Sequence, residues 1–175
     1  FTPHMPNRRD FIKTSVVAGT AVGLSSKPLM SQSNLSPHKP LETVKVGFVG
    51  IGVKGTSHLG ILMHMDGVEI TAVCDLLEDQ CKEAQAQAKR LGQPIPTAYH
   101  RGEWDFRRMC EEEDLDLVYT ATPWRWHTPV CLAAMENGKH AATEIPAAYT
   151  LDDCWKLVET SEKTGKHCVM MENVN

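Results

Sequence analysis

A glycine-rich turn that joins an apolar run to a helix constrains this chain more than any other feature. The run starts at Val44 and leads directly into Gly50-Ile51-Gly52-Val53-Lys54-Gly55, and Thr56–Met65 then has helical character. In a strand–turn–helix unit of this kind, the first glycine makes the tight turn and the second lets the backbone approach a pyrophosphate. The third allows the helix to pack closely on the strand. The helix N-terminus would offer unpaired N–H groups and the positive end of its dipole to the phosphates.

A second strand and an acid extend this unit. The glycine motif alone is a weak signal, but Val68–Cys74 is predicted as a strand that ends at Asp75, twenty residues beyond Gly55. A carboxylate at that place accepts hydrogen bonds from ribose hydroxyls, so the order predicts dinucleotide binding. Leu76 stands where an NADP enzyme more often has arginine, which favours NAD. Asp75 and Glu78 also match a capping box, so Asp75 is expected to cap the next helix as well.

The rest of the chain alternates between predicted helices and short strands. The helices are Leu76–Leu91, Trp104–Glu111, Val130–Asn137 and Leu151–Lys163, and the strands are Thr97–Tyr99, Leu115–Ala121, His140–Glu144 and His167–Met171. The alternation predicts an α/β, Rossmann-type domain over residues 41–175, with a doubly wound parallel sheet and helices on both faces. Ligands of such sheets bind at the carboxyl ends of the strands. A single site is therefore expected where the strands end, at Gly50, Asp75, Thr122–His127, Glu144 and Glu172–Asn173.

Charge and cysteine content exclude several classes of function. Residues 41–175 hold thirteen Lys and Arg against twenty-one Asp and Glu, which argues against a nucleic-acid partner. The six cysteines are scattered with no C-x-x-C pair, and we expect them to be small buried hydrophobes rather than disulfides or metal ligands. No run approaches the 18 or more apolar residues of a membrane span. The sequence is compatible with a homo-oligomer and does not define the oligomeric state.

Residues 1–40 differ from the remainder, with five Lys and Arg and a single acid. The segment Asn7–Lys13 contains Arg8-Arg9 and resembles the twin-arginine export signature, and a weakly apolar stretch follows from Thr14 to Leu24. We therefore expect a signal peptide with a polar linker, and a periplasmic or secreted protein. A basic, amphipathic first helix of the folded domain is the alternative.

Three further segments give a more specific resemblance. Ala121-Thr122-Pro123 with His127, the run Ala134–His140, and Glu144-Ile145-Pro146 resemble the Gfo/Idh/MocA oxidoreductase family. Within it, the segments Trp124–His127, Glu144–Ala148 and Met170–Asn173 are similar to glycoside hydrolase family 109, the NAD-dependent α-N-acetylgalactosaminidases. The resemblance covers about residues 44–175.

The resemblance implies the residues that contact NAD. Carried over position by position, these are Val53, Lys54, Asp75, Trp124, Arg125, Trp126, His127, Glu144, Ile145 and Asn173. Two departures matter. Dehydrogenases of the wider family have Lys at the position of Ile145, and the hydrolase branch usually has Asn-Arg at Val53-Lys54. Judged from the residues alone, the two tryptophans could be packing aromatics, His127 a helix cap and Glu144 an exposed acid.

The resemblance also implies a mechanism and a second domain. NAD⁺ would oxidise the sugar at C3, a protein base would remove the acidified C2 proton and expel the group at C1, and water would add before the hydride returns. The base and the sugar contacts would lie in a C-terminal α/β substrate domain beyond Asn175, so no catalytic residue is assigned within the chain. Two other functions remain open: a sugar oxidoreductase of the same family, and a truncated product that binds nucleotide without catalysis.

Overall fold

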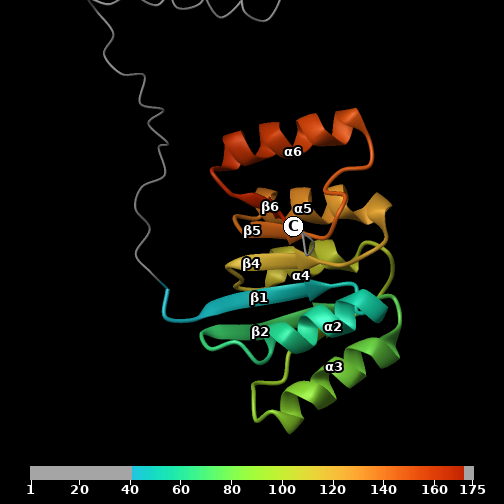
Figure 1. The fold of residues 1–175 in the computed structure, drawn as a ribbon, viewed down its shortest axis with the longest axis vertical. Coiled ribbons are helices and arrows are strands. Elements are labelled where there is room, and N and C mark those ends of the chain that lie inside the picture. The colour runs from blue at the N-terminus through green and yellow to red at the C-terminus, as the bar shows by residue number, and fades with distance from the viewer. Residues whose placement is uncertain (1–40, 172–175) are drawn as a thin grey trace, which may run out of the picture. The chain divides into compact units, whose positions relative to one another are not determined.

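The computed structural model describes residues 41–171 (Figure 1). The predicted signal peptide in residues 1–40 and the predicted cofactor contact at Asn173 lie outside the described residues. In chain order the elements are β1 (Val44–Val49), α2 (Val53–Leu62), β2 (Val68–Cys74), α3 (Glu78–Arg90), β3 (Thr97–Tyr99), α4 (Asp105–Glu112), β4 (Leu117–Thr120), η1 (Trp124–Trp126), α5 (His127–Glu136), β5 (His140–Thr143), α6 (Leu151–Thr164) and β6 (Cys168–Met170).

The strands form one parallel sheet in the order β3-β2-β1-β4-β5-β6. This is the strand order of a Rossmann fold, and the order reverses between β1 and β4. Helices α2 and α3 cover one face of the sheet, and α4 and α5 cover the other (Figure 1). The predicted fold class is confirmed, and the carboxyl ends of the strands meet at one edge as expected.

Alternating side chains of β1 place the sheet between two apolar cores. Val46 and Phe48 belong to the core beneath α2 and α3, whereas Val49 belongs to the core beneath α4, α5 and α6. Both kinds of position are buried, since β1 is a central strand covered on both faces. The packing leaves no room for a side chain at Gly47, because a Cβ there would lie 2.6 Å from Leu115 Cδ1.

Two helices begin earlier than the sequence predicts. Helix α2 starts at Val53 rather than Thr56, so Gly55 lies inside the helix instead of before it. Helix α5 starts at His127 rather than Val130, after the short η1 turn. Pro129 is therefore the third residue of α5, where a missing backbone N–H costs no helical hydrogen bond.

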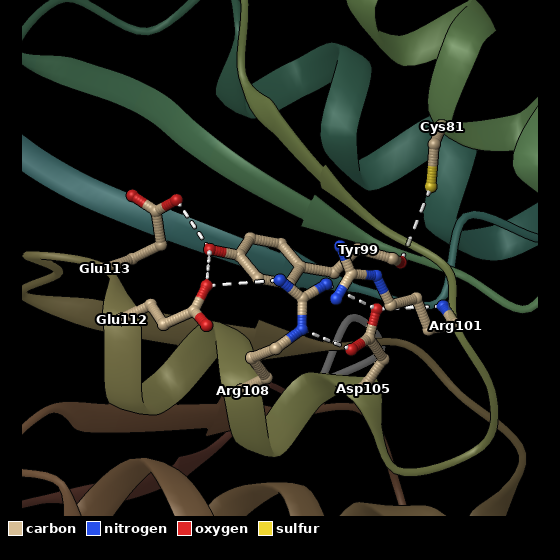
Figure 2. Close-up of polar contacts among 7 residues, drawn as sticks. All are labelled: Cys81, Tyr99, Arg101, Asp105, Arg108, Glu112 and Glu113. Carbon is tan, nitrogen blue, oxygen red and sulfur yellow. Dashed lines mark hydrogen bonds and ion pairs between the residues drawn. The ribbon is translucent and has the colours of Figure 1, made fainter.

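A polar network fixes the loop between β3 and α4 (Figure 2). Asp105 accepts hydrogen bonds from Arg108 Nε at 2.8 Å, from Arg108 Nη2 at 3.0 Å and from the backbone N–H of Arg101 at 2.9 Å. Burial by itself raises the pKa of Asp105, but the hydrogen bonds from Arg108 and Arg101 hold that pKa below its usual range. The Arg108 guanidinium also lies 4.4 Å from the centre of the Tyr99 ring, and the Tyr99 hydroxyl donates to Glu113 at 2.8 Å. The network therefore anchors residues 100–104, which border the site described next.

Candidate functional site

The glycine-rich turn has the geometry that the motif predicts. Gly50 has a φ of +88°, and a Cβ there would lie 2.9 Å from the backbone nitrogen of Thr122. A Cβ on Gly55 would lie only 1.9 Å from the carbonyl oxygen of Gly50. Gly50 thus makes the tight turn and Gly55 allows helix α2 to approach it, so neither position accommodates a larger residue without backbone movement.

Gly52 and the start of α2 leave an open backbone surface. A Cβ on Gly52 would meet no atom within 4 Å. Gly52 is also the N-cap of α2, and the helix has no side-chain cap and no acidic residue in its first turn. An uncapped helix N-terminus next to open space suits a phosphate, because backbone N–H groups and the helix dipole both favour an anion there. These residues fit the pyrophosphate of a dinucleotide.

Asp75 connects the glycine-rich turn to the end of β2. Its Oδ2 accepts a hydrogen bond from the backbone N–H of Ile51 at 2.6 Å, and its Oδ1 accepts one from the backbone N–H of Leu77 at 2.9 Å. The predicted capping box is wrong, because α3 begins at Glu78 with Leu77 as its N-cap. Since each carboxylate oxygen has two lone pairs, Asp75 can hold the turn and still accept hydrogen bonds from ribose hydroxyls.

A cavity of about 230 Å³ lies at this edge of the sheet. Five of the residues predicted to contact the cofactor line it: Gly50, Gly52, Asp75, Arg125 and Trp126. The remaining lining comes from the ends of β1, β2 and β4 with the residues that follow them, from the anchored loop before α4, and from α4 and α5. These residues are Val49, Cys74, Leu76, Gly102, Glu103, Phe106, Ala121, Thr122, Pro123 and Val130. Burial raises the pKa of the Cys74 thiol above its usual range, so this wall contributes a neutral thiol rather than a nucleophile.

The two tryptophans of η1 have different environments. Trp126 packs edge-on against Trp104, with ring centroids 4.8 Å apart, and against Phe106 at 6.1 Å, while it also lines the cavity. Trp124 is 59% exposed. Between them, Arg125 lies 3.3 Å from Glu103 at the exposed rim of the cavity. Trp126 therefore combines the packing role with a place at the cavity, and a cofactor contact by Trp124 stays a prediction.

His127 joins the segments that follow β4 and β5. The side chain is only 1% exposed, with Nδ1 2.7 Å from the carbonyl oxygen of Pro146 and Nε2 2.8 Å from that of Thr122. A neutral imidazole can donate to only one of these oxygens, whereas the doubly protonated ring donates to both. The structure thus gives His127 a packing and tethering role, and its predicted contact with a cofactor stays a prediction.

The other predicted contacts lie at the same edge but outside the cavity. Glu144 follows β5 and contacts Tyr119 and His58, two residues that belong to no recognisable sequence motif. A polar Tyr119 within the apolar strand β4 is the one signal that could have drawn attention to this cluster. Ile145 is 39% exposed and Val53 is 95% exposed. Lys54 is also exposed, in the first turn of α2.

The six cysteines differ in how far they are buried. Cys74, Cys81, Cys110 and Cys131 are buried as expected, but Cys168 is half-buried and Cys154 is exposed. Within residues 41–171 there is no group of three or more His, Cys, Asp and Glu side chains that could hold a metal ion. None of the helices in this part of the chain is long and apolar enough to cross a membrane.

Comparison with solved structures identifies similar folds. The WlbA dehydrogenase of Chromobacterium violaceum, solved with NADH and UDP-GlcNAcA, matches 78% of this chain and 38% of its own length, with a TM-score of 0.63 and 27% identity. The scyllo-inositol dehydrogenase of Lactobacillus casei, solved with NAD(H) and scyllo-inositol, matches 73% of this chain and 36% of its own length, with a TM-score of 0.63. At 22% identity the second likeness shows the fold alone.

Curated relatives are more similar in sequence. A glycosyl hydrolase family 109 protein of Saccharopolyspora erythraea is 40% identical over 95% of this chain, and an α-N-acetylgalactosaminidase of Shewanella oneidensis is 36% identical over 98% of it. The chain spans 39–40% of the length of these two relatives. The model of the oxidoreductase family with an NAD-binding Rossmann fold matches residues 44–172. The chain therefore belongs to the Gfo/Idh/MocA oxidoreductase family and comprises its NAD-binding Rossmann domain.

Proposed function

We propose that this chain is the NAD-binding part of an exported glycosidase that removes terminal α-N-acetylgalactosamine. The observation that carries the proposal is the pairing of a nucleotide site with hydrolase relatives. Gly52, Asp75 and Trp126 border one cavity beside an uncapped helix, and the relatives at 36–40% identity are named as family 109 hydrolases, one of them as an α-N-acetylgalactosaminidase.

The residues of the chain would bind and orient the cofactor. The N-terminus of α2 and Gly52 would face the pyrophosphate, and Asp75 would accept hydrogen bonds from the ribose of the adenosine. When bound, NAD would supply reversible oxidation of the sugar at C3, which makes the C2 proton acidic enough for a base to remove. Ile145 supports hydrolysis over ordinary alcohol oxidation, because its side chain can neither donate nor accept a proton.

A sugar oxidoreductase is the second candidate. The observation in its favour is the structural likeness to the WlbA dehydrogenase, which is solved with NADH and a sugar nucleotide. The two candidates differ in their products. An oxidoreductase reduces NAD to NADH in proportion to the substrate that it oxidises, whereas the proposed glycosidase releases the group at C1 without net change in the cofactor.

The test uses this chain joined to the proposed C-terminal substrate domain (the longer protein) and a chromogenic aryl α-N-acetylgalactosaminide. Release of the aryl group that stops when NAD is stripped and resumes when NAD is added supports the proposal. Accumulation of NADH in proportion to substrate, without aryl release, would instead favour the oxidoreductase. The 175-residue chain alone should bind NAD and show no turnover. Hydride transfer needs the sugar C3 held about 3–3.5 Å from the nicotinamide, and the proposed substrate domain would supply the contacts that hold it.

A further inference from the structure

Glu144 is held by side chains from two other elements. Its Oε1 accepts a hydrogen bond from the Tyr119 hydroxyl of β4 at 3.1 Å and lies 2.9 Å from His58 Nε2 of α2. The side chains of His58 and Glu144 are only 20% and 13% exposed. Both contacts fall on the same oxygen, and within residues 41–171 no hydrogen bond reaches Oε2. Glu144 therefore keeps one acceptor atom for a ligand.

The protons that face Glu144 come from Tyr119 and His58. Burial, with the neighbouring Glu144 carboxylate, raises the pKa of Tyr119, so the phenol keeps its single proton and donates it to Glu144. His58 Nε2 forms an ion pair with the same carboxylate when the imidazole is protonated. His58 Nδ1 lies 3.4 Å from the Tyr119 oxygen, and in the protonated ring it can donate a hydrogen bond to that oxygen, so the three side chains contact one another pairwise.

Stacked rings hold the two donors in place. The Tyr119 ring stacks on Phe48 with centroids 5.0 Å apart and planes 7° apart, and the His58 ring lies 5.8 Å from Tyr119 at 30°. Phe48 is fully buried at the centre of the sheet. The His58 imidazole is therefore held in place by the core beneath α2, and its contact with Oε1 in turn fixes the Glu144 side chain.

The position of Glu144 in the sheet indicates which half of a dinucleotide it faces. A Rossmann sheet consists of two mononucleotide-binding halves that meet where the strand order reverses. Asp75 follows β2 in the first half, whereas Glu144 follows β5 in the second half, across the reversal between β1 and β4. The first half takes the adenosine, so Glu144 lies on the nicotinamide side.

We propose that His58 is a positioning residue for the nicotinamide half of NAD. It fixes Glu144 through Oε1 and leaves Oε2 to accept a hydrogen bond from an O–H or N–H group of the bound nicotinamide riboside. This inference rests on the proposed cofactor role of the chain. It assigns to helix α2 a second task beyond its N-terminus, since His58 lies on the helix face that contacts β4 and the end of β5.

The test compares NAD with ADP, which lacks the nicotinamide riboside, by calorimetry on the 175-residue chain. His58→Phe keeps an aromatic ring against Tyr119 but removes the donor, and it should weaken NAD binding about tenfold, the scale of one hydrogen bond to a charged group. ADP binding should not change. His58→Gln retains a donor and should restore most of the NAD affinity. His64→Phe, the same change at an exposed position just beyond α2, is the matched control and should change neither affinity.

A double-mutant cycle separates positioning from a general effect on the helix. Glu144→Gln should weaken NAD binding selectively, and adding His58→Phe should weaken it no further. If His58→Phe fails to fold, Tyr119→Phe, which removes the other donor to Oε1, should give the same selective loss. Equal loss of NAD and ADP affinity in His58→Phe would overturn the inference, as would normal NAD binding in that variant while Glu144→Gln is impaired. A wild-type chain that binds neither nucleotide would refute the proposed function and this inference with it.

Discussion

Replacement of Asp75 should affect both stability and cofactor choice. In Asp75→Ala the N–H of Ile51, partly buried, loses its acceptor at 2.6 Å, and an unsatisfied buried donor costs about 1–3 kcal/mol. The N–H of Leu77 is exposed, so water replaces the lost contact there and adds little. The free energy of unfolding should therefore fall by about 1–3 kcal/mol in the absence of nucleotide.

The effect on binding comes from the other lone pairs of Asp75. Hydrogen bonds from ribose hydroxyls to a carboxylate contribute about 1–3 kcal/mol, so NAD should bind about 5–150-fold more weakly to Asp75→Ala. The wild-type chain should prefer NAD, because Asp75 would repel the 2′-phosphate of NADP and Leu76 offers no cation. Asp75→Asn removes the repulsion and should narrow that preference.

Calorimetry with NAD and NADP, combined with chemical unfolding, measures both effects. Asp79→Ala is the matched control, since Asp79 is an aspartate only four residues further along the chain, in the first turn of α3, with its side chain 96% exposed. It should leave stability and both affinities within experimental error. Equal affinity for NAD and NADP in the wild type, unchanged in Asp75→Ala, would refute the role assigned to this carboxylate.

Three further outcomes are expected. Gly55→Ala should unfold the domain or sharply lower its melting temperature, because the new Cβ would lie 1.9 Å from a backbone oxygen. Gly60→Ala in the same helix is the control and should be tolerated, since its new Cβ meets only the flexible Gln87 side chain. Since the folded-state pKa of Asp105 is lowered, its contribution to stability is present above about pH 4 and is lost as pH falls further, and acid unfolding of Asp105→Asn should depend less on pH in that range. Replacement of Arg8 and Arg9 by lysine should keep the longer protein in the cytoplasm of a bacterial host, and periplasmic protein in that fractionation would contradict twin-arginine export.

The fold was predictable because the sequence is periodic where the core requires it. Strand Val68–Cys74 and strand Thr97–Tyr99 have the bounds that the sequence predicts, since both are short segments rich in β-branched or aromatic residues between clear helix and turn signals. The helix starts were less accurate. Gly55 and Pro129 resemble helix boundaries in sequence, but close packing on Gly50 and the tolerance of a first turn for proline place both inside helices.

The site was predictable only in part. Gly50, Gly52 and Asp75 follow from motif spacing, because that spacing reflects the geometry of one strand–turn–helix unit. The contacts of Asp75 with Ile51 and of Glu144 with His58 join residues that are far apart in the chain. Such pairings depend on strand order and on side-chain orientation, and neither can be inferred from local sequence.

Solvent deuterium incorporation tests the proposed function most directly. The longer protein is incubated with an α-N-acetylgalactosaminide in D₂O, and the released sugar is analysed by NMR and mass spectrometry. Removal of the C2 proton by a base, followed by reprotonation from solvent, should place deuterium at C2, and turnover should stop when NAD is removed. A released sugar without deuterium at C2, or turnover that does not depend on the cofactor, would contradict the proposal.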